Sequence, residues 1–163
     1  MRKIALWARS RSVQIFNFMA IATIKTKLKA LLESIVPATL GEVQVDDLKT
    51  SIFDRDIGAY PCAILTTPEV GADYLTNREN IRTYNFAVVV IQKRENISGA
   101  NDIETLIETI LNKFDNDPTL TGSADGGVEP SSSAPAAYES RGATFITFTI
   151  FVKAKESIPL TFS

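Results

Sequence analysis

The feature that most constrains the fold is the order of five apolar-patterned segments along the chain. Two of them repeat apolar residues every three or four positions, as amphipathic helices do, and three alternate or run continuously, as strands do. This order predicts an α+β domain, in which two helices pack on one face of a mainly antiparallel, four- to five-stranded sheet. In chain order the segments are a helix at 21–36, strands at 60–65 and 82–92, a helix at 101–114 and a strand at 144–153.

The two helical segments have recognisable ends as well as apolar stripes. The first ends before Pro37, because a proline disfavours helical geometry in the residue that precedes it. The second follows Ser98 and Asn101-Asp102, which supply capping side chains, and Pro118 prevents its continuation. The stripe of the second helix is the clearest pattern in the chain and consists of Ile103, Leu106, Ile107, Ile110, Leu111 and Phe114.

The strand at 82–92 is apolar on both faces through its middle. Such a strand is central in its sheet, or has one face covered by helices and the other by a partner. The strand at 144–153 alternates more cleanly, with Ile146, Phe148, Ile150 and Val152 in one row. Residues 41–52 and 138–140 carry weaker strand patterns, which we expect to add to the same sheet.

Two connecting segments are long enough to suggest a role of their own. Residues 67–81 are polar and too long for a tight turn, so we expect an extended hairpin or flap. Residues 121–137 are rich in Gly, Ser, Pro and Ala and are expected to form a flexible loop, because they cannot bury enough apolar surface to offset the entropy of ordering. We therefore expect that residues 123–136 can be deleted without unfolding the monomer.

Composition narrows the class of protein. The length of 163 residues favours one domain, at 19–163. The net charge of −2 argues against a general attraction to DNA or anionic membrane. The single cysteine excludes an internal disulfide. No apolar run approaches the roughly 20 residues of a membrane span. Residues 1–18 are basic and contain no acid, so they are either a targeting segment or an extension upstream of Met19, and we expect them to be peripheral or loosely ordered.

The chemistry-bearing residues do not form a recognisable catalytic set. There is no histidine to act as a base for Cys62, which lies in an apolar strand and is expected to be a buried core thiol. The pairs Asp46-Asp47, Asp54/Asp56 and Asp115/Asp117 are of the type that binds metal, but the third lacks the glycine and glutamate of a calcium loop. The sequence therefore predicts a protein that is not an enzyme, with no catalytic residue, cofactor or metal site.

Several short motifs give the chain a family resemblance. The strand that opens with Tyr60-Pro61 follows the first helix, and the second helix runs into the sequence Asp117-Pro118-Thr119-Leu120-Thr121-Gly122. A glycine-rich stretch and a closing strand of Thr, Phe and Ile complete the order. Over about residues 20–155 the chain resembles the tail terminator (tail-completion, minor tail) proteins of tailed bacteriophages.

The resemblance implies a structural virion protein. Such proteins form a ring, typically homo-hexameric, that caps the tail tube, stops its polymerisation and joins it to the head connector. The implied partners are further copies of the chain, the tail tube protein and the connector or neck protein. DNA would pass through the ring without specific binding, no membrane would be involved, and the protein would be assembled in the host cytoplasm and end in the tail or neck of the virion.

We expect the two long connecting segments to carry the assembly contacts. A closed ring needs a head-to-tail contact between two dissimilar surfaces, which two dissimilar loops can supply. The candidate contact residues are Glu69, Asp73, Tyr74, Arg78, Glu79, Arg82, Asp125, Glu129 and Tyr138.

Three other functions fit part of the pattern. A head-closure or tail-to-head joining neck protein shares the element order and differs in its partner. A cap of a pilus or secretion tube shares the same physics. A small α+β ligand-binding domain or enzyme would need a concave site with convergent polar groups, and the sequence offers no obvious set.

Overall fold

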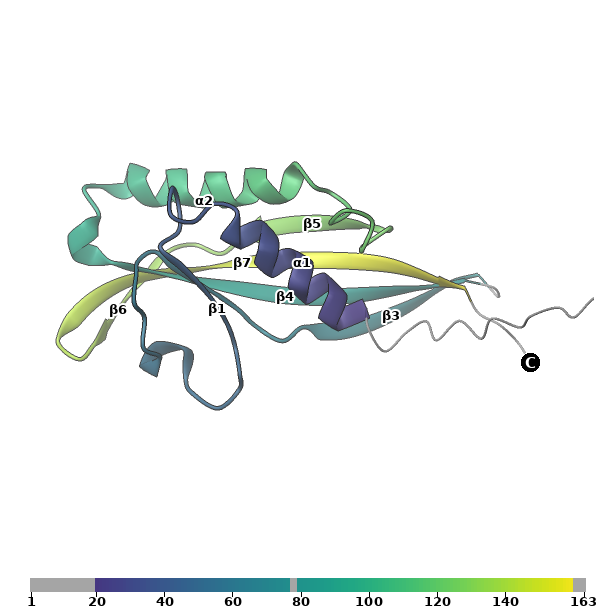
Figure 1. Ribbon diagram of the computed structural model, residues 1–163, viewed down its shortest axis with the longest axis horizontal. Helices are drawn as coiled ribbons and strands as arrows, with labels where there is room; N and C mark the ends of the chain where they lie inside the picture. The colour runs from purple at the N-terminus through teal and green to yellow at the C-terminus, as the bar shows by residue number, and fades with distance from the viewer. Residues whose placement is uncertain (1–19, 77–78, 160–163) are drawn as a thin grey trace, which may run out of the picture.

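The chain forms two helices and a seven-stranded sheet in the computed structural model, which describes residues 20–76 and 79–159 (Figure 1). The basic segment 1–18 lies outside the described residues, so its expected peripheral placement stays a prediction. The elements are α1 (Ala20–Glu33), β1 (Glu42–Val45), the 3-10 turn η1 (Ile52–Asp54), β2 (Cys62–Leu65), β3 (Glu69–Thr76), β4 (Glu79–Lys93), the 3-10 turn η2 (Arg94–Asn96), α2 (Ala100–Asp115), β5 (Gly127–Ser132), β6 (Ala136–Ser140) and β7 (Ala143–Pro159).

The sheet is mixed but mostly antiparallel, which confirms the α+β class. Its order is β1-β2-β4-β7-β5, with β3 paired to β4 and β6 paired to β7, and β1 and β2 are the parallel pair. The count of seven strands exceeds the expected four to five. The reason is that β4 and β7 are 15 and 17 residues long, so each pairs along one edge with two shorter strands in succession.

The main core lies between the helices and one face of the sheet. Phe86 of β4 stands opposite Val152 of β7, and alternate residues of both strands turn toward the helices. Burial of each large apolar side chain there stabilises the fold by roughly 1.5–3 kcal/mol. Among the described residues, neither helix is long and apolar enough to cross a membrane. From the helices the core receives Ile24, Leu28, Leu32, Ile103, Leu106, Ile110 and Phe114.

The opposite face of the sheet, here called the outer face, is only partly covered. Toward β1 and β6, Cys62, Ile64 and Ile91 form a small buried cluster beneath the loop that joins β1 to β2. Further along β7, the side chain of Phe151 is 49% exposed. The central strands thus have helices on one face and an incomplete layer on the other.

The Gly/Ser/Pro/Ala-rich segment is more structured than its composition suggests. Residues 127–132 form β5, which pairs with β7, and Leu120 and Ala124 are fully buried. A Cβ added to Gly126 would lie 2.7 Å from Cβ of Lys155, so the glycine permits the close approach to β7. Deleting 123–136 would remove an edge strand of the sheet, contrary to the expectation that the monomer tolerates this deletion. The composition of this segment did not indicate a strand, because pairing of its backbone with the long strand β7 requires few apolar side chains.

Candidate assembly surfaces

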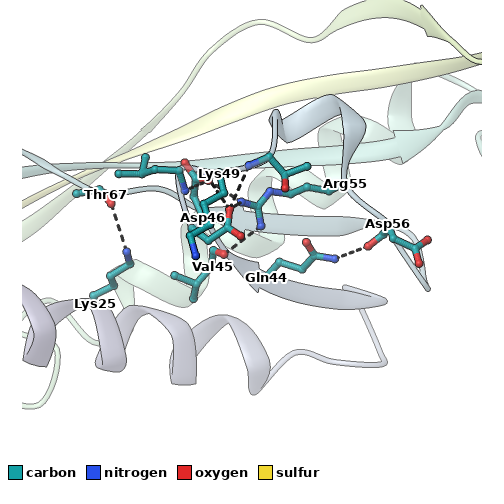
Figure 2. Close-up of polar contacts among 11 residues, drawn as sticks. Lys25, Gln44, Val45, Asp46, Lys49, Arg55, Asp56 and Thr67 are labelled. Carbon is teal, nitrogen blue, oxygen red and sulfur yellow. Dashed lines mark hydrogen bonds and ion pairs between the residues drawn. The ribbon is translucent and has the colours of Figure 1, made fainter.

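The loop between β1 and β2 is braced by a largely buried arginine (Figure 2). Nη2 of Arg55 lies 2.6 Å from Oδ1 of Asp46 and 2.6 Å from Oδ1 of Asp47, and Nη1 donates to the carbonyl of Val45 at 3.2 Å. The side chain of Arg55 is 9% exposed and that of Asp46 is 11% exposed. The carboxylates of Asp46 and Asp47 therefore bind the guanidinium of Arg55, which belongs to the same loop.

A second carboxylate fixes the other end of the same loop. Oε2 of Glu42 accepts hydrogen bonds from the backbone N–H groups of Gly58 at 2.8 Å and Ala59 at 3.3 Å, and Oε1 accepts one from Gln44 at 2.9 Å. The hydrogen bond from Gln44, followed by those from Gly58 and Ala59, lowers the pKa of Glu42 below its ordinary value. Gln44 also donates to the carbonyl of Asp56 at 2.8 Å (Figure 2). The loop is thus tied to β1 at both ends.

This bracing presents an apolar side chain to solvent at the loop tip. Leu48 is 75% exposed and has a φ of 60°, a left-handed conformation that costs a leucine roughly 1 kcal/mol. Its N–H donates to Oδ1 of Asp46 at 3.0 Å, and the N–H of Lys49 donates to Oδ1 of Asp47 at 3.1 Å. The sequence analysis missed this site. The sequence feature that could have indicated it is Leu48 itself, a lone apolar residue between Asp46-Asp47 and Lys49 that belongs to no helix or strand pattern.

Aromatic side chains cover the β1–β6 half of the outer face. The ring of Tyr138 stacks on Phe145 with 5.2 Å between centroids and meets Phe53 of the loop at 4.6 Å. Burial raises the pKa of Tyr138, and burial also raises the pKa of the Cys62 thiol beneath the loop to about 12. The prediction that Cys62 is a buried core thiol is confirmed, and a thiol with this pKa is a poor nucleophile at neutral pH.

The other half of the outer face contains an open groove of about 580 Å³. Phe151 lies in it beside Lys153, and the groove brings together two predicted contact residues that are far apart in sequence, Glu69 and Glu129. The groove also includes Ser131, which stands opposite Phe151 in the pairing of β5 with β7. Its lining includes apolar side chains as well as the charged Glu69, Glu129 and Lys153.

The hairpin predicted at 67–81 is confirmed as an antiparallel pair of β3 and the first half of β4. Figure 1 shows these strands running past the end of the helical layer. Asp73 is exposed on β3, and Tyr74 stands in register with Asn80 of β4. Arg82 is partly buried in β4, whereas Arg78 lies outside the described residues.

Three other predicted contact residues make bonds within the chain. Glu79 accepts a hydrogen bond from the hydroxyl of Ser157, and Asp125 accepts one from the Ser157 N–H at 2.8 Å, so the structure brings these two acids together. Glu129 pairs with Lys155 across β5 and β7, and the hydrogen bond from Lys155 holds the pKa of Glu129 below its ordinary value. Whether these residues also meet a partner stays a prediction.

A second groove lies alongside α2, at the edge of the sheet formed by β5 and β6. It has a volume of about 460 Å³. Arg94 and Glu104 lie among its lining residues, and so does Ala100, the first residue of the helix. The apolar lining, which gives the groove its character, consists of Ile97, Ile103, Ile107, Pro135 and Ile146.

Within residues 20–76 and 79–159, no group of three or more His, Cys, Asp or Glu side chains is arranged to hold a metal ion. The acids Asp46 and Asp47 bind Arg55, and Asp117 accepts hydrogen bonds from the backbone and hydroxyl of Thr121 at 2.8 and 3.1 Å. Asp46, Asp47 and Asp117, three of the acids considered as ligands, thus make hydrogen bonds or ion pairs within their own loops.

No protein-family model matches the chain. No curated protein matches it either. Among solved structures, the chain is similar to a protein whose name states no function, at 13% identity, over 87% of this chain and 94% of the other, with a TM-score of 0.43. A similarity at this level carries no argument about fold or function.

Proposed function

We propose that the chain is a structural assembly protein, a tail terminator that forms a ring with its own copies and caps a phage tail tube. The observation that carries the proposal is the incomplete layer on the outer face of the sheet. The central strands β4 and β7 are covered by helices on one face, while Phe151 on the other is 49% exposed in a groove that also contains Glu69 and Glu129. An exposed aromatic side chain in a groove bordered by charges offers a place for a partner protein to pack, which supports the proposal.

In this proposal the sheet acts as a platform of five rows. These are β1, β2 with β3, β4, β7, and β5 with β6, since β2 and β3 share one edge of β4 and β5 and β6 share one edge of β7. Both helices lie over one face of the platform, which leaves the outer face and the projecting β3–β4 hairpin for neighbours. A homo-hexameric ring then uses dissimilar surfaces of each copy in a head-to-tail contact.

The remaining partners follow from the same proposal. One face of the ring meets the tail tube protein and the other meets the head connector. The chain's net charge of −2 supports a channel through which DNA slides, because an acidic surface repels phosphates and prevents tight binding. The protein would act in the tail or neck of the virion after assembly in the host cytoplasm.

Electron microscopy of the particles made after deletion of this gene tests the proposal. Overlong tails that lie unjoined beside full heads are the expected result. Tails of normal length that fail to attach would contradict a terminator and assign the head-side neck role, in which the chain joins the finished tail to the head. Unchanged particles would contradict both roles.

A further inference from the structure

We propose that the tip of the β1–β2 loop binds the α2 groove of a second copy, with Leu48 as its apolar anchor. This inference rests on the proposal that the chain assembles with copies of itself, and it names the two surfaces that would make the contact. The observations that carry it are the exposed, left-handed leucine of the tip, the apolar lining of the groove and the opposite charges beside each.

The tip has the properties of a preformed anchor. Leu48 is 75% exposed and is held in a left-handed conformation by its hydrogen bond to Asp46, which Arg55 in turn fixes. A backbone that is already held in its bound conformation loses little entropy on binding, which favours the affinity of a contact. An isolated monomer gains nothing from exposing a leucine in this conformation.

The α2 groove is a suitable receptor for an aliphatic side chain. Its volume of about 460 Å³ lies within the range of pockets that bind small ligands. Five of its lining residues are Ile or Pro: Ile97, Ile103, Ile107, Pro135 and Ile146.

Each of the two surfaces carries one acidic and one basic residue beside its apolar part. At the tip, the anchor stands between Asp47, whose side chain is 52% exposed, and the exposed Lys49. The groove has the basic Arg94 and the acidic Glu104, both exposed, together with its isoleucines. In the proposed contact Asp47 pairs with Arg94 and Lys49 pairs with Glu104, whereas the opposite orientation places like charges together.

The two surfaces lie at opposite edges of the molecule. The loop follows β1, one edge strand of the sheet, and α2 packs beside β5 at the other edge. Figure 1 shows the loop below the sheet and α2 above it. Later in the loop, Phe53 reaches Tyr138 of β6 across the outer face, whereas the groove is lined by Ile103 and Ile146 of the main core on the helical side. In the proposed contact the tip of one copy therefore enters the groove of the next. This is a head-to-tail contact, the kind that closes into rings.

Two variants test the contact from its two sides. Leu48→Asn removes the anchor while suiting the left-handed backbone, so the monomer should stay folded. Ala100→Trp fills the groove from an exposed position at the start of α2. Sedimentation velocity of the full chain should show self-association of the wild type below about 1 mM, and at least about tenfold weaker association of either variant. Ile21→Gln is the control. It changes an exposed apolar side chain on α1, away from the tip and the groove, and should associate as the wild type does.

Mixing gives the sharper result. The Leu48→Asn chain keeps an intact groove and the Ala100→Trp chain keeps an intact tip, so an equimolar mixture should form one-to-one complexes although neither forms higher oligomers alone. A charge exchange tests the same contact. Lys49→Glu and Glu104→Lys should each weaken association, and the chain that carries both should regain it. Wild-type affinity in Leu48→Asn, or no complex in the mixture, would overturn the inference while leaving the ring intact. A wild-type chain that stays monomeric at about 1 mM would overturn it as well, and normal tail lengths after gene deletion would remove the terminator role separately.

Discussion

Arg55 shows how one residue can organise a loop that contains little regular structure. Its guanidinium is largely buried, binds Asp46 and Asp47 and caps the carbonyl of Val45. Buried charges are tolerated when each is paired and hydrogen-bonded, and they become costly when one partner is removed. Arg55 thus holds Asp46, whose carboxylate accepts the N–H of the exposed Leu48, while Glu42 holds the other end of the loop.

Arg55→Ala should lower the free energy of unfolding by about 2–4 kcal/mol, because it leaves the nearly buried carboxylate of Asp46 without its counter-ion. Urea denaturation of the wild type and the variant measures the change. Lys29→Ala is the matched control, since Lys29 forms an exposed pair with Glu33 and its loss should cost less than about 0.5 kcal/mol. Equal changes in the two variants would contradict the bracing role of Arg55.

Glu42 gives the loop a dependence on pH. Its pKa is lowered from the ordinary 4.5, first by the hydrogen bond from Gln44 and then by those from Gly58 and Ala59. A carboxyl whose pKa is lowered on folding stabilises the protein above its unfolded pKa, and this stabilisation is lost as the pH falls through the folded value. Stability should therefore fall below about pH 4.5, and less steeply in Glu42→Gln. Thermal unfolding between about pH 6 and pH 3 measures both slopes, with Glu108→Gln as a charge-matched control on α2. Identical slopes for the wild type and Glu42→Gln would rule out this linkage.

These residue-scale features mark a limit of sequence reasoning. The Asp46-Asp47 pair was visible in the sequence, but its partner is fixed by the path of an irregular loop, which no periodic pattern encodes. Cys62 was predictable because its apolar neighbours and a strand pattern define its environment locally. The sequence placed Asp125 and Glu129 in a flexible loop as contact residues. In the structure both have partners on β7 of the same chain, Ser157 for Asp125 and Lys155 for Glu129.

At the scale of elements, the sequence predicted the long helices and strands and two of the short strands, but not β5. The helices α1 and α2 and the strands β4 and β7 follow the predicted segments, and the predicted weak strands correspond to β1 and β6. The strand β5 was missed because its sequence, Gly127–Ser132, has one large apolar residue and a proline. A neighbouring strand of 17 residues offers it backbone partners, and the length of that neighbour was itself underestimated.

Gly41 lies where an added side chain would meet the backbone of a neighbouring segment. A Cβ there would lie 2.8 Å from backbone atoms of Ala59 and Tyr60, where the chain passes close to the start of β1. Gly41→Ala should therefore destabilise the protein by about 1–3 kcal/mol, as measured by thermal unfolding. Gly71→Ala, in β3, has nothing within 4 Å of the added Cβ and should be nearly neutral. A neutral Gly41→Ala would show that the crossing between the loop and β1 is not close-packed.

At the scale of the whole molecule, the described chain has one well-covered face, one partly covered face and two edges of different character. The helical layer buries the main core, the outer face exposes Phe151 above a groove, and the loop tip and the α2 groove lie at opposite edges. Such an arrangement offers separate surfaces to several neighbours. The sequence predicted central strands that are apolar on both faces. It did not predict the grooves, because their positions depend on which loops cover which half of the sheet.

The most direct test of the account is to measure the lengths of tail tubes that polymerise from their own tube protein with and without this chain. We predict that added chain stops growth and that electron microscopy shows a ring on one end of each tube. Tubes that grow to the same lengths with bare ends, at chain concentrations above that of the tube protein, would contradict the proposed terminator.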